Sequence, residues 1–312
     1  MEIDSEVIDW LMAGDPAIRW QVQRDLLGVD SAAERRRVAR HGWGKRLVEL
    51  QFDDGRWSAG RGPKGYRGLY IPKWTSTTYT LLLLRRLGLP PNSASGRAGC
   101  AALVGGSQWF DDGSVGPWAS KKTDTCVCGM FLGLLEYFDY AAPKERKGLL
   151  KFLLQQQKPD GGWNCRAGSK VSSFHTTITV LEGLALVEGG RPPRPVRAAI
   201  RRGQEYFLAR GCLRSLRSGK VVQSSFTRFS FPPRWKYDVL RALDSFTATR
   251  APDLRLEEAI QLVTDKRRKD GTWNLQNRHS GETHFEMERP GQPSRWNTLR
   301  ALRVLKWWSR LR

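Results

Sequence analysis

Three residues of metal-binding type begin two successive helical stretches of this chain. Asp124 and Cys126 stand two positions apart at the start of one stretch, and His175 stands at the start of the next, 49 residues after Cys126. A carboxylate oxygen, a thiolate and an imidazole nitrogen bind zinc and leave a fourth tetrahedral position open, as in catalytic zinc sites. A thiol bound there would lose its proton and become a nucleophile near neutral pH. These residues predict a catalytic zinc site.

The spacing of Asp124 and Cys126 sets a geometric condition for that site. Positions i and i+2 are about 200° apart around an ideal helix, so both side chains reach one ion only if Asp124 lies in the cap, outside the helix. The alternative is structural: Asp124 caps its helix, Cys126 is a small buried residue, and His175 donates to a loop carbonyl. The sequence leaves both interpretations open.

Other titratable residues suggest acid–base chemistry. His284 and Glu286 lie in the longest connection between a glycine turn and the following helix, from Gly271 to Asn297. Long connections in a compact repeat body are commonly functional, so we interpret this one as a lid that carries an acid and a base. A solvated loop is the alternative. Asp238, at another helix start, is the candidate acid for a reaction begun by protonation.

Aromatic and cationic residues gather at the same helix starts. The aromatic residues that directly precede a helix start include Trp74, Trp235 and Trp296. They predict an aromatic collar that suits an isoprenoid chain or a cationic intermediate, with simple repeat packing as the alternative. The nearby cations are Lys73, Arg166, Lys170, Arg234 and Lys236. Helix N-termini favour anions, so we expect a phosphate or diphosphate among these residues.

A repeat positions all of these residues. The block Asp-Gly-x-Trp occurs at 54–57, 160–163 and 270–273, and two worn copies contain Gly113 and Gly219. The five glycines are separated by 58, 48, 58 and 52 residues. Each block follows one helix-like stretch and precedes another, and a period of this length is typical of stacked helix pairs that bury their apolar faces against neighbours.

The repeat predicts an all-α fold, an α/α toroid of about six helix pairs in a single domain that spans residues 1–312. Residues 1–32 form an N-terminal helix pair in this interpretation, with Asp15 as N-cap and Pro16 at the first helical position, and 33–312 form five repeat units. Mostly apolar inner helices follow Thr or Asp residues. The outer helices are Arg-rich, over roughly 33–51, 95–106, 143–157, 195–210 and 254–268. An open solenoid is the alternative, although it would need polar end caps.

Composition limits the class of protein. The chain has 312 residues, 52 Lys and Arg against 31 Asp and Glu, and a formal charge of +21, which favours anionic partners such as phosphates, nucleic acid or a lipid surface. The acidic start lacks a signal-peptide pattern, and no run approaches the length of a membrane span. We expect a cytoplasmic protein, with a peripheral position at the membrane as the alternative. Five cysteines at irregular spacing do not predict a disulfide framework.

The sequence resembles a known superfamily at the repeat. The Gln-rich helix end 154–157 followed by Asp160-Gly161-Gly162-Trp163 is similar to the repeat of squalene and oxidosqualene cyclases and of protein prenyltransferase β subunits. The cyclases supply their acid from an Asp-x-Asp-Asp motif, which this sequence lacks. The closest segments, 52–55 and 110–113, lie inside repeat turns, where carboxylates more often bond the backbone.

The prenyltransferase branch matches the site residues better. The resemblance implies that Asp124, Cys126 and His175 are zinc ligands and that Lys121 contacts diphosphate. It also implies an isoprenoid diphosphate substrate and a helical partner subunit. Trp118 stands where that family has an Arg, and Val127 replaces a Tyr, so a transferase would need the other cations named above.

Three functions follow as hypotheses. The first is a zinc-dependent transferase that acts on an isoprenoid diphosphate or a similar anionic substrate. The second is a terpene or squalene cyclase-like enzyme that uses an acid outside the usual motif. The third is a non-catalytic basic toroid that binds nucleic acid or an anionic membrane, and its binding would depend steeply on salt.

Overall fold

The computed structural model describes residues 3–59, 66–118, 123–166 and 168–311. The regular secondary structure of the described residues is helical apart from one two-stranded antiparallel ribbon, in which β1 (Gln108–Trp109) pairs with β2 (Val115–Gly116). It divides into two compact units. Unit 1 comprises residues 1–44, 207–280 and 285–312, and unit 2 comprises 45–206 and 281–284. The predicted single domain stays a prediction.

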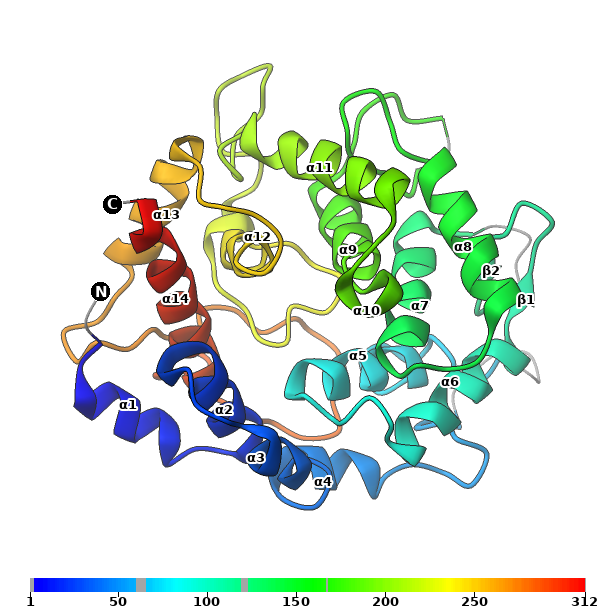
Figure 1. Cartoon of the computed structure of the whole chain (residues 1–312), viewed down its shortest axis with the longest axis horizontal. Coiled ribbons are helices and arrows are strands. Elements are labelled where there is room, and N and C mark those ends of the chain that lie inside the picture. Colours follow the sequence, from blue (N-terminus) through cyan, green and yellow to red (C-terminus); the bar gives the residue numbers. More distant parts are fainter. Residues whose placement is uncertain (1–2, 60–65, 119–122, 167, 312) are drawn as a thin grey trace. The chain divides into compact units, whose positions relative to one another are not determined.

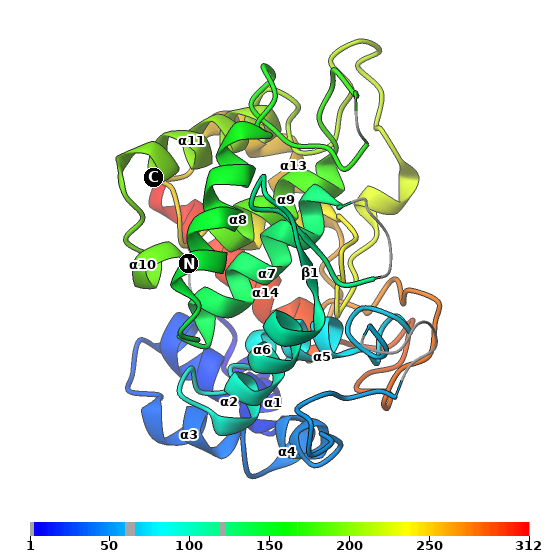
Figure 2. The same ribbon diagram turned by 90° about the vertical axis from the view of Figure 1, so that its right-hand side faces the viewer.

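Unit 2 holds the helices of the second, third and fourth predicted outer stretches and the inner helices before them. They are α5 (Thr77–Leu87), α6 (Ala94–Gly106), α7 (Thr125–Tyr137), α8 (Pro143–Gln155), α9 (Phe174–Leu184), the short α10 (Val187–Gly190) and most of α11 (Arg194–Leu208). Helix α7 packs against both α9 and α8 (Figures 1 and 2). It is buried on nearly every side from Val127 to Leu135, as its low charge predicts.

Unit 1 contains both ends of the described chain. Its elements are α1 (Ser5–Met12), α2 (Pro16–Gln21), the π-helix η1 (Val22–Leu27), α3 (Ala32–Arg37), η2 (Ser224–Thr227), α12 (Val239–Phe246), η3 (Leu254–Leu256), α13 (Glu257–Asp265), α14 (Arg295–Trp308) and η4 (Ser309–Leu311). Helix α4 (Gly42–Val48) crosses from unit 1 into unit 2. The predicted cap at Asp15 is confirmed, since its carboxylate accepts the N–H of Ala17 at 2.8 Å.

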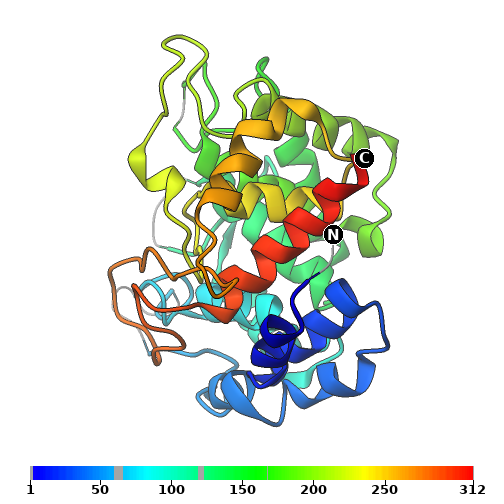
Figure 3. The same ribbon diagram turned by 90° about the vertical axis from the view of Figure 1, so that its left-hand side faces the viewer.

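The last inner helix contacts the first helices of the chain. Helix α14 packs against α2 and η1 (Figure 3), and Arg295 donates to the carbonyl of Trp10 at 3.0 Å. These contacts join the two ends of the described chain within unit 1.

The Asp-Gly-x-Trp block joins each outer helix to the next inner helix through hydrogen bonds. The indole N–H of Trp57, Trp163 and Trp273 donates to an outer-helix carbonyl at 2.6, 2.7 and 2.7 Å. The backbone N–H of the last two donates to a Thr hydroxyl of the following inner helix at 3.0 Å. The Asp carboxylate bonds the backbone two residues on, as predicted for turn carboxylates.

The glycine of the block is required by the close approach of the next repeat. Gly161 has φ +90°, and a Cβ there would lie 2.3 Å from the carbonyl oxygen of Arg202. Gln157 donates to the carbonyl of Gly161 and to that of Ala199 on α11. The turn therefore joins one repeat to the next through backbone atoms, which explains why the sequence pattern recurs.

Candidate thiol site

Asp124 is the N-cap residue of α7, but its carboxylate makes no cap bond. Its backbone is extended, with φ −110° and ψ 126°, which meets the condition that Asp124 lie outside the helix. By contrast, Ser173 caps the neighbouring helix α9 with its side chain. The Asp124 carboxylate forms no hydrogen bond with any residue that the structure describes, so capping does not account for it.

A second thiol lies beside Cys126. The sulfur of Cys165 accepts the backbone N–H of Cys126 at 3.2 Å and the hydroxyl of Thr176 at 3.4 Å, and the Cys126 thiol bonds to it as well. Both thiols are free and half-buried. Cys126 is the second residue of α7, so its N–H is one of the donors that a helix leaves without an internal partner.

These donors stabilise a thiolate at Cys165. The hydrogen bond from the Cys126 thiol is the largest cause that lowers the pKa of Cys165, and the Thr176 hydroxyl and Cys126 N–H act in the same direction. Burial and the charge of Asp124 oppose them, but the net direction is downward. The pKa of Cys126 rises well above its usual value, first because its thiol donates to Cys165 and then because it is buried. The pair therefore assigns the negative charge to Cys165.

Asp124 is a second titratable group beside the thiols. Burial raises the pKa of its carboxyl group, and the charge of Lys73 acts in the opposite direction. The carboxylate also disfavours ionisation of both cysteines. A carboxyl group whose pKa is raised is a better proton acceptor than an ordinary carboxylate.

The predicted zinc ligands are not assembled as a set. Among the described ranges, no three or more His, Cys, Asp or Glu side chains are arranged so that they could hold a metal ion. Cys126 is instead engaged with Cys165, and the position of His175 one residue before Thr176 does not bring it into such a group. Zinc binding stays a prediction.

An aromatic cluster lies against the thiol site. Tyr70 and Tyr79 have ring centroids 5.2 Å apart and hydroxyl oxygens 2.9 Å apart. The rings of Trp74 and Trp118 lie 4.8 Å from Tyr79 and 5.2 Å from Tyr70 respectively. Burial raises the pKa of Tyr70, and the charges of Cys126 and Asp124 raise it further. These charge effects indicate that the Tyr70 hydroxyl lies within electrostatic range of the thiol site.

The predicted acid and base, His284 and Glu286, have separate partners. The Nε2 atom of His284 lies 2.9 Å from the hydroxyl of Thr80 on α5, within unit 2. Glu286 forms an ion pair with Arg278 in unit 1. Residues 281–284 pack on unit 2, since a Cβ on Gly281 would lie 2.5 Å from the indole nitrogen of Trp74. The lid role stays a prediction.

The predicted cations fall into two groups. In unit 2, Lys73, Arg166 and Lys170 are exposed, and the ammonium of Lys73 lies 5.6 Å from the ring centroid of Tyr70. In unit 1, the ammonium of Lys236 lies 4.1 Å from the ring centroid of Trp235, and Arg234 is the residue before Trp235 in the sequence. Lys121 lies outside the described residues. Only Lys73 has a described interaction with the thiol site, through Asp124.

Two predicted residues have structural roles in unit 1. Asp238 is the N-cap of α12 and is 1% exposed. One carboxylate oxygen accepts the N–H of Arg241, and the other accepts the N–H and hydroxyl of Ser230. Trp296 is 2% exposed and stacks on Phe231 at a centroid distance of 4.1 Å. Both oxygens of Asp238 are thus occupied, and Trp296 packs as the simpler alternative predicts.

Sequence reasoning missed Cys165 and Tyr70. Cys165 lies two positions after Trp163, in the segment that connects the repeat turn to the start of α9. This position in the repeat was the sequence signal that could have identified it. Tyr70 lies in an irregular segment before α5, where no periodic pattern indicates which side chains turn inward.

Comparison with known proteins places the fold. No protein-family model matches the chain, and no curated protein is significantly similar to it in sequence. A polysaccharide lyase structure shares 11% identity, covers 98% of this chain and 97% of its own, and has a TM-score of 0.50. A protein from Actinoplanes has 18% identity, coverages of 95% and 90%, and a TM-score of 0.46. The type II terpene cyclase MstE from Scytonema has 13% identity, covers 88% of this chain and 97% of its own, and has a TM-score of 0.41.

The similarity to the polysaccharide lyase structure concerns the fold alone. The all-α toroid fold class predicted from the repeat is confirmed. The closer resemblance to prenyltransferase β subunits stays a prediction. None of the helices in the described part of the chain combines the length and apolar character needed to cross a bilayer, and the cytoplasmic location stays a prediction.

Proposed function

We propose that this protein is an enzyme whose reactive group is the thiolate of Cys165, in the site formed by Cys126, Cys165, Thr176 and Asp124. The observation that carries the proposal is the set of three donors on one sulfur: a thiol, a hydroxyl and a helix N-terminal N–H. Reactive cysteines are those whose thiolate is stabilised in a partly exposed setting, whereas structural cysteines are buried and inert.

The other cysteines of the chain provide the contrast. Burial raises the pKa of Cys100, Cys128 and Cys212 to about 12, and all three are fully buried. Cys128 lies only two positions from Cys126 on α7, yet its partner is the hydroxyl of Thr123 at 3.3 Å. The difference between Cys165 and Cys128 is therefore local, and it does not arise from the general basicity of the chain.

The surroundings support a substrate with an apolar body and an anionic group. The cluster of Tyr70, Trp74, Tyr79 and Trp118 offers aromatic surface, and Lys73 offers a cation. An isoprenoid diphosphate, the substrate class implied by the resemblance, has both parts. Attack by the thiolate on the carbon that bears diphosphate would form a carbon–sulfur bond as the carbon–oxygen bond breaks and diphosphate leaves.

Alkylation by iodoacetamide tests the reactive thiol. In the full-length protein at neutral pH, we expect one rapidly modified cysteine, identified as Cys165 by peptide mass spectrometry. Cys165→Ser should lose it and Cys128→Ser should keep it. Geranylgeranyl diphosphate should slow the modification more than inorganic diphosphate does, because the aromatic cluster would bind its isoprenoid chain. Uniformly slow modification of all five cysteines would refute the proposal.

A zinc site at the same thiols is the second candidate. It is favoured by the Asp124 carboxylate, which has no hydrogen-bond partner among the described residues and lies near two thiols. Cys126 and Cys165 would hold the metal together with Asp124 or His175 after a change of side-chain position, and zinc would lower the pKa of a bound thiol or water. About one zinc per chain, lost in Cys126→Ser and Cys165→Ser, would support this candidate. Metal-free protein with a fast-reacting Cys165 would support the thiolate alone.

A further inference from the structure

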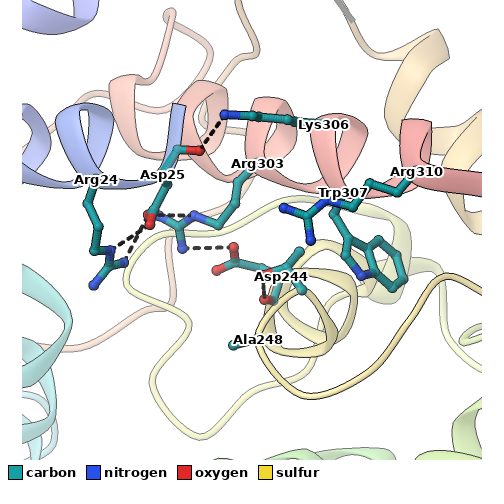
Figure 4. Close-up of a pocket in the computed structure, with 9 residues that line it drawn as sticks. Arg24, Asp25, Asp244, Ala248, Arg303, Lys306, Trp307 and Arg310 are labelled. Atoms are coloured by element: carbon teal, nitrogen blue, oxygen red, sulfur yellow. Dashed lines mark hydrogen bonds and ion pairs between the residues drawn. The ribbon is translucent and has the colours of Figure 1, made fainter. Parts of the chain in front are cut away.

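Unit 1 contains a pocket of about 420 Å³, which we call the arginine pocket. It lies between the π-helix η1, the end of α12 and the C-terminal end of α14 (Figure 4). Its lining residues are Arg24, Asp25, Asp244, Thr247, Ala248, Arg303, Lys306, Trp307 and Arg310. A volume of this size is within the range of small-molecule sites, about 300–1,000 Å³.

The lining carries four cations and two carboxylates. Both carboxylates are already engaged, because Arg303 binds Asp25 and Asp244 at 3.0 Å each and Arg24 also pairs with Asp25. Figure 4 shows Arg303 between the two acids. The carboxylates thus hold Arg303 in place and leave the pocket with an excess of positive charge.

The excess comes from Lys306 and Arg310. The ammonium of Lys306 donates to the backbone carbonyls of Asp25 and Leu26 at 3.1 and 2.8 Å, so its charge has no carboxylate partner there. Arg310 is exposed and forms no ion pair with any residue that the structure describes. A guanidinium beside a fixed ammonium matches the geometry and charge of a phosphate group.

The backbone at the pocket is also unusual. Arg24 and Asp25 belong to the six-residue π-helix η1, and such segments are rare and occur frequently at functional sites. The indole N–H of Trp307 donates to the carbonyl of Arg250 at 2.9 Å, which fixes this ring as one wall. The pocket is therefore preformed by hydrogen bonds that do not use Arg310.

We infer that the arginine pocket binds a small molecule that carries a phosphate group, with Arg310, Lys306 and Arg24 as its contacts. The inference is independent of the thiol chemistry, because it rests on residues of unit 1 and the thiol site lies in unit 2. The ligand is a free phosphate or a phosphorylated metabolite, and the following experiment distinguishes them.

Isothermal titration calorimetry of the full-length protein with inorganic phosphate, glycerol 3-phosphate and glycerol tests the inference. We expect glycerol 3-phosphate to bind and glycerol not to bind. Arg310→Gln should weaken binding about tenfold, the effect of one charge-assisted hydrogen bond. Arg217→Gln is the matched control, because it removes the same charge at an exposed position of unit 1 outside the pocket. Cys165→Ser should bind as the wild type does.

Each outcome decides a point. Equal affinity for phosphate and glycerol 3-phosphate would identify the free anion as the ligand, and tighter binding of glycerol 3-phosphate would indicate a phosphorylated metabolite. No binding of either compound would overturn the inference. Equal weakening by Arg310→Gln and Arg217→Gln would also overturn it, because it would show attraction to the overall charge of the protein and not to this pocket.

Discussion

The Thr176 hydroxyl provides a direct test of the thiol site. Thr176→Val removes the donor that lies 3.4 Å from the Cys165 sulfur and replaces it with a methyl group of the same shape. Valine is β-branched as threonine is, so α9 should keep its backbone. Because the hydroxyl stabilises the charged form of Cys165, its removal should raise the pKa of that thiol.

The magnitude follows from the hydrogen bond. A hydrogen bond to a charged group contributes about 1.5–3 kcal/mol, and one pKa unit corresponds to about 1.4 kcal/mol. The predicted shift is therefore about one unit, the lower end of this range, since sulfur is a diffuse acceptor and two other donors remain. At a pH below the pKa, this shift lowers the thiolate fraction about tenfold.

The assay is the rate of iodoacetamide alkylation at Cys165 as a function of pH, from about pH 5 to about pH 10, the range in which perturbed thiols titrate. The midpoint of the rate profile should move upward by about one unit in Thr176→Val. The plateau rate at high pH should change little. Thr123→Val is the matched control, because its hydroxyl bonds Cys128 and not Cys165.

An unchanged midpoint in Thr176→Val would refute the reasoning, because it would mean that the hydroxyl does not stabilise the thiolate. An equal shift in Thr123→Val would refute it as well, since the effect would then not depend on a hydrogen bond to Cys165. Circular dichroism on both variants would confirm that the helices are retained.

Three further predictions concern stability. Asp244→Asn removes the carboxylate shared by the buried Arg300 and the half-buried Arg303 and should lower the free energy of unfolding by about 3 kcal/mol, measured by urea denaturation; a loss below about 1 kcal/mol would contradict the assigned network. Trp163→Phe should cost about 1–3 kcal/mol in the same assay, because it leaves a buried carbonyl of α8 without its donor, and a neutral effect would show that the indole bond is dispensable. Burial lowers the pKa of His279 from 6.5 to about 4. Between these two pH values the unfolded chain therefore binds a proton at this residue and the folded chain does not. Stability should fall by up to about 3 kcal/mol as pH drops from about 6.5 to about 4, and His279→Gln should have a shallower slope over that window.

The repeat was readable from sequence because its determinants are local. The glycine, the tryptophan and the helix starts lie within about twenty-five residues of one another along the chain, and each has one physical role. Gly161 allows a left-handed turn against Arg202, and Trp163 joins α8 to the start of α9. Helix ranges could therefore be predicted, although the first outer stretch is divided into the short helices α3 and α4.

The candidate site was only partly readable. The sequence singled out Asp124 and Cys126 at a helix start, and the structure places both there. It could not show that Asp124 leaves its own helix uncapped, because Asp15 and Asp238 have the same residue type and do cap. Capping depends on side-chain direction, which residue spacing does not determine.

By itself, the sequence determined the helical repeat, its turns and the positions of the helix starts, since all of these depend on backbone conformation and short-range periodicity. Only the tertiary structure decided that Cys165 is the partner of Cys126 and that Arg303 lies between Asp25 and Asp244. Those contacts join residues 39 or more positions apart along the chain, and which distant side chains meet is set by the packing of one helix on another.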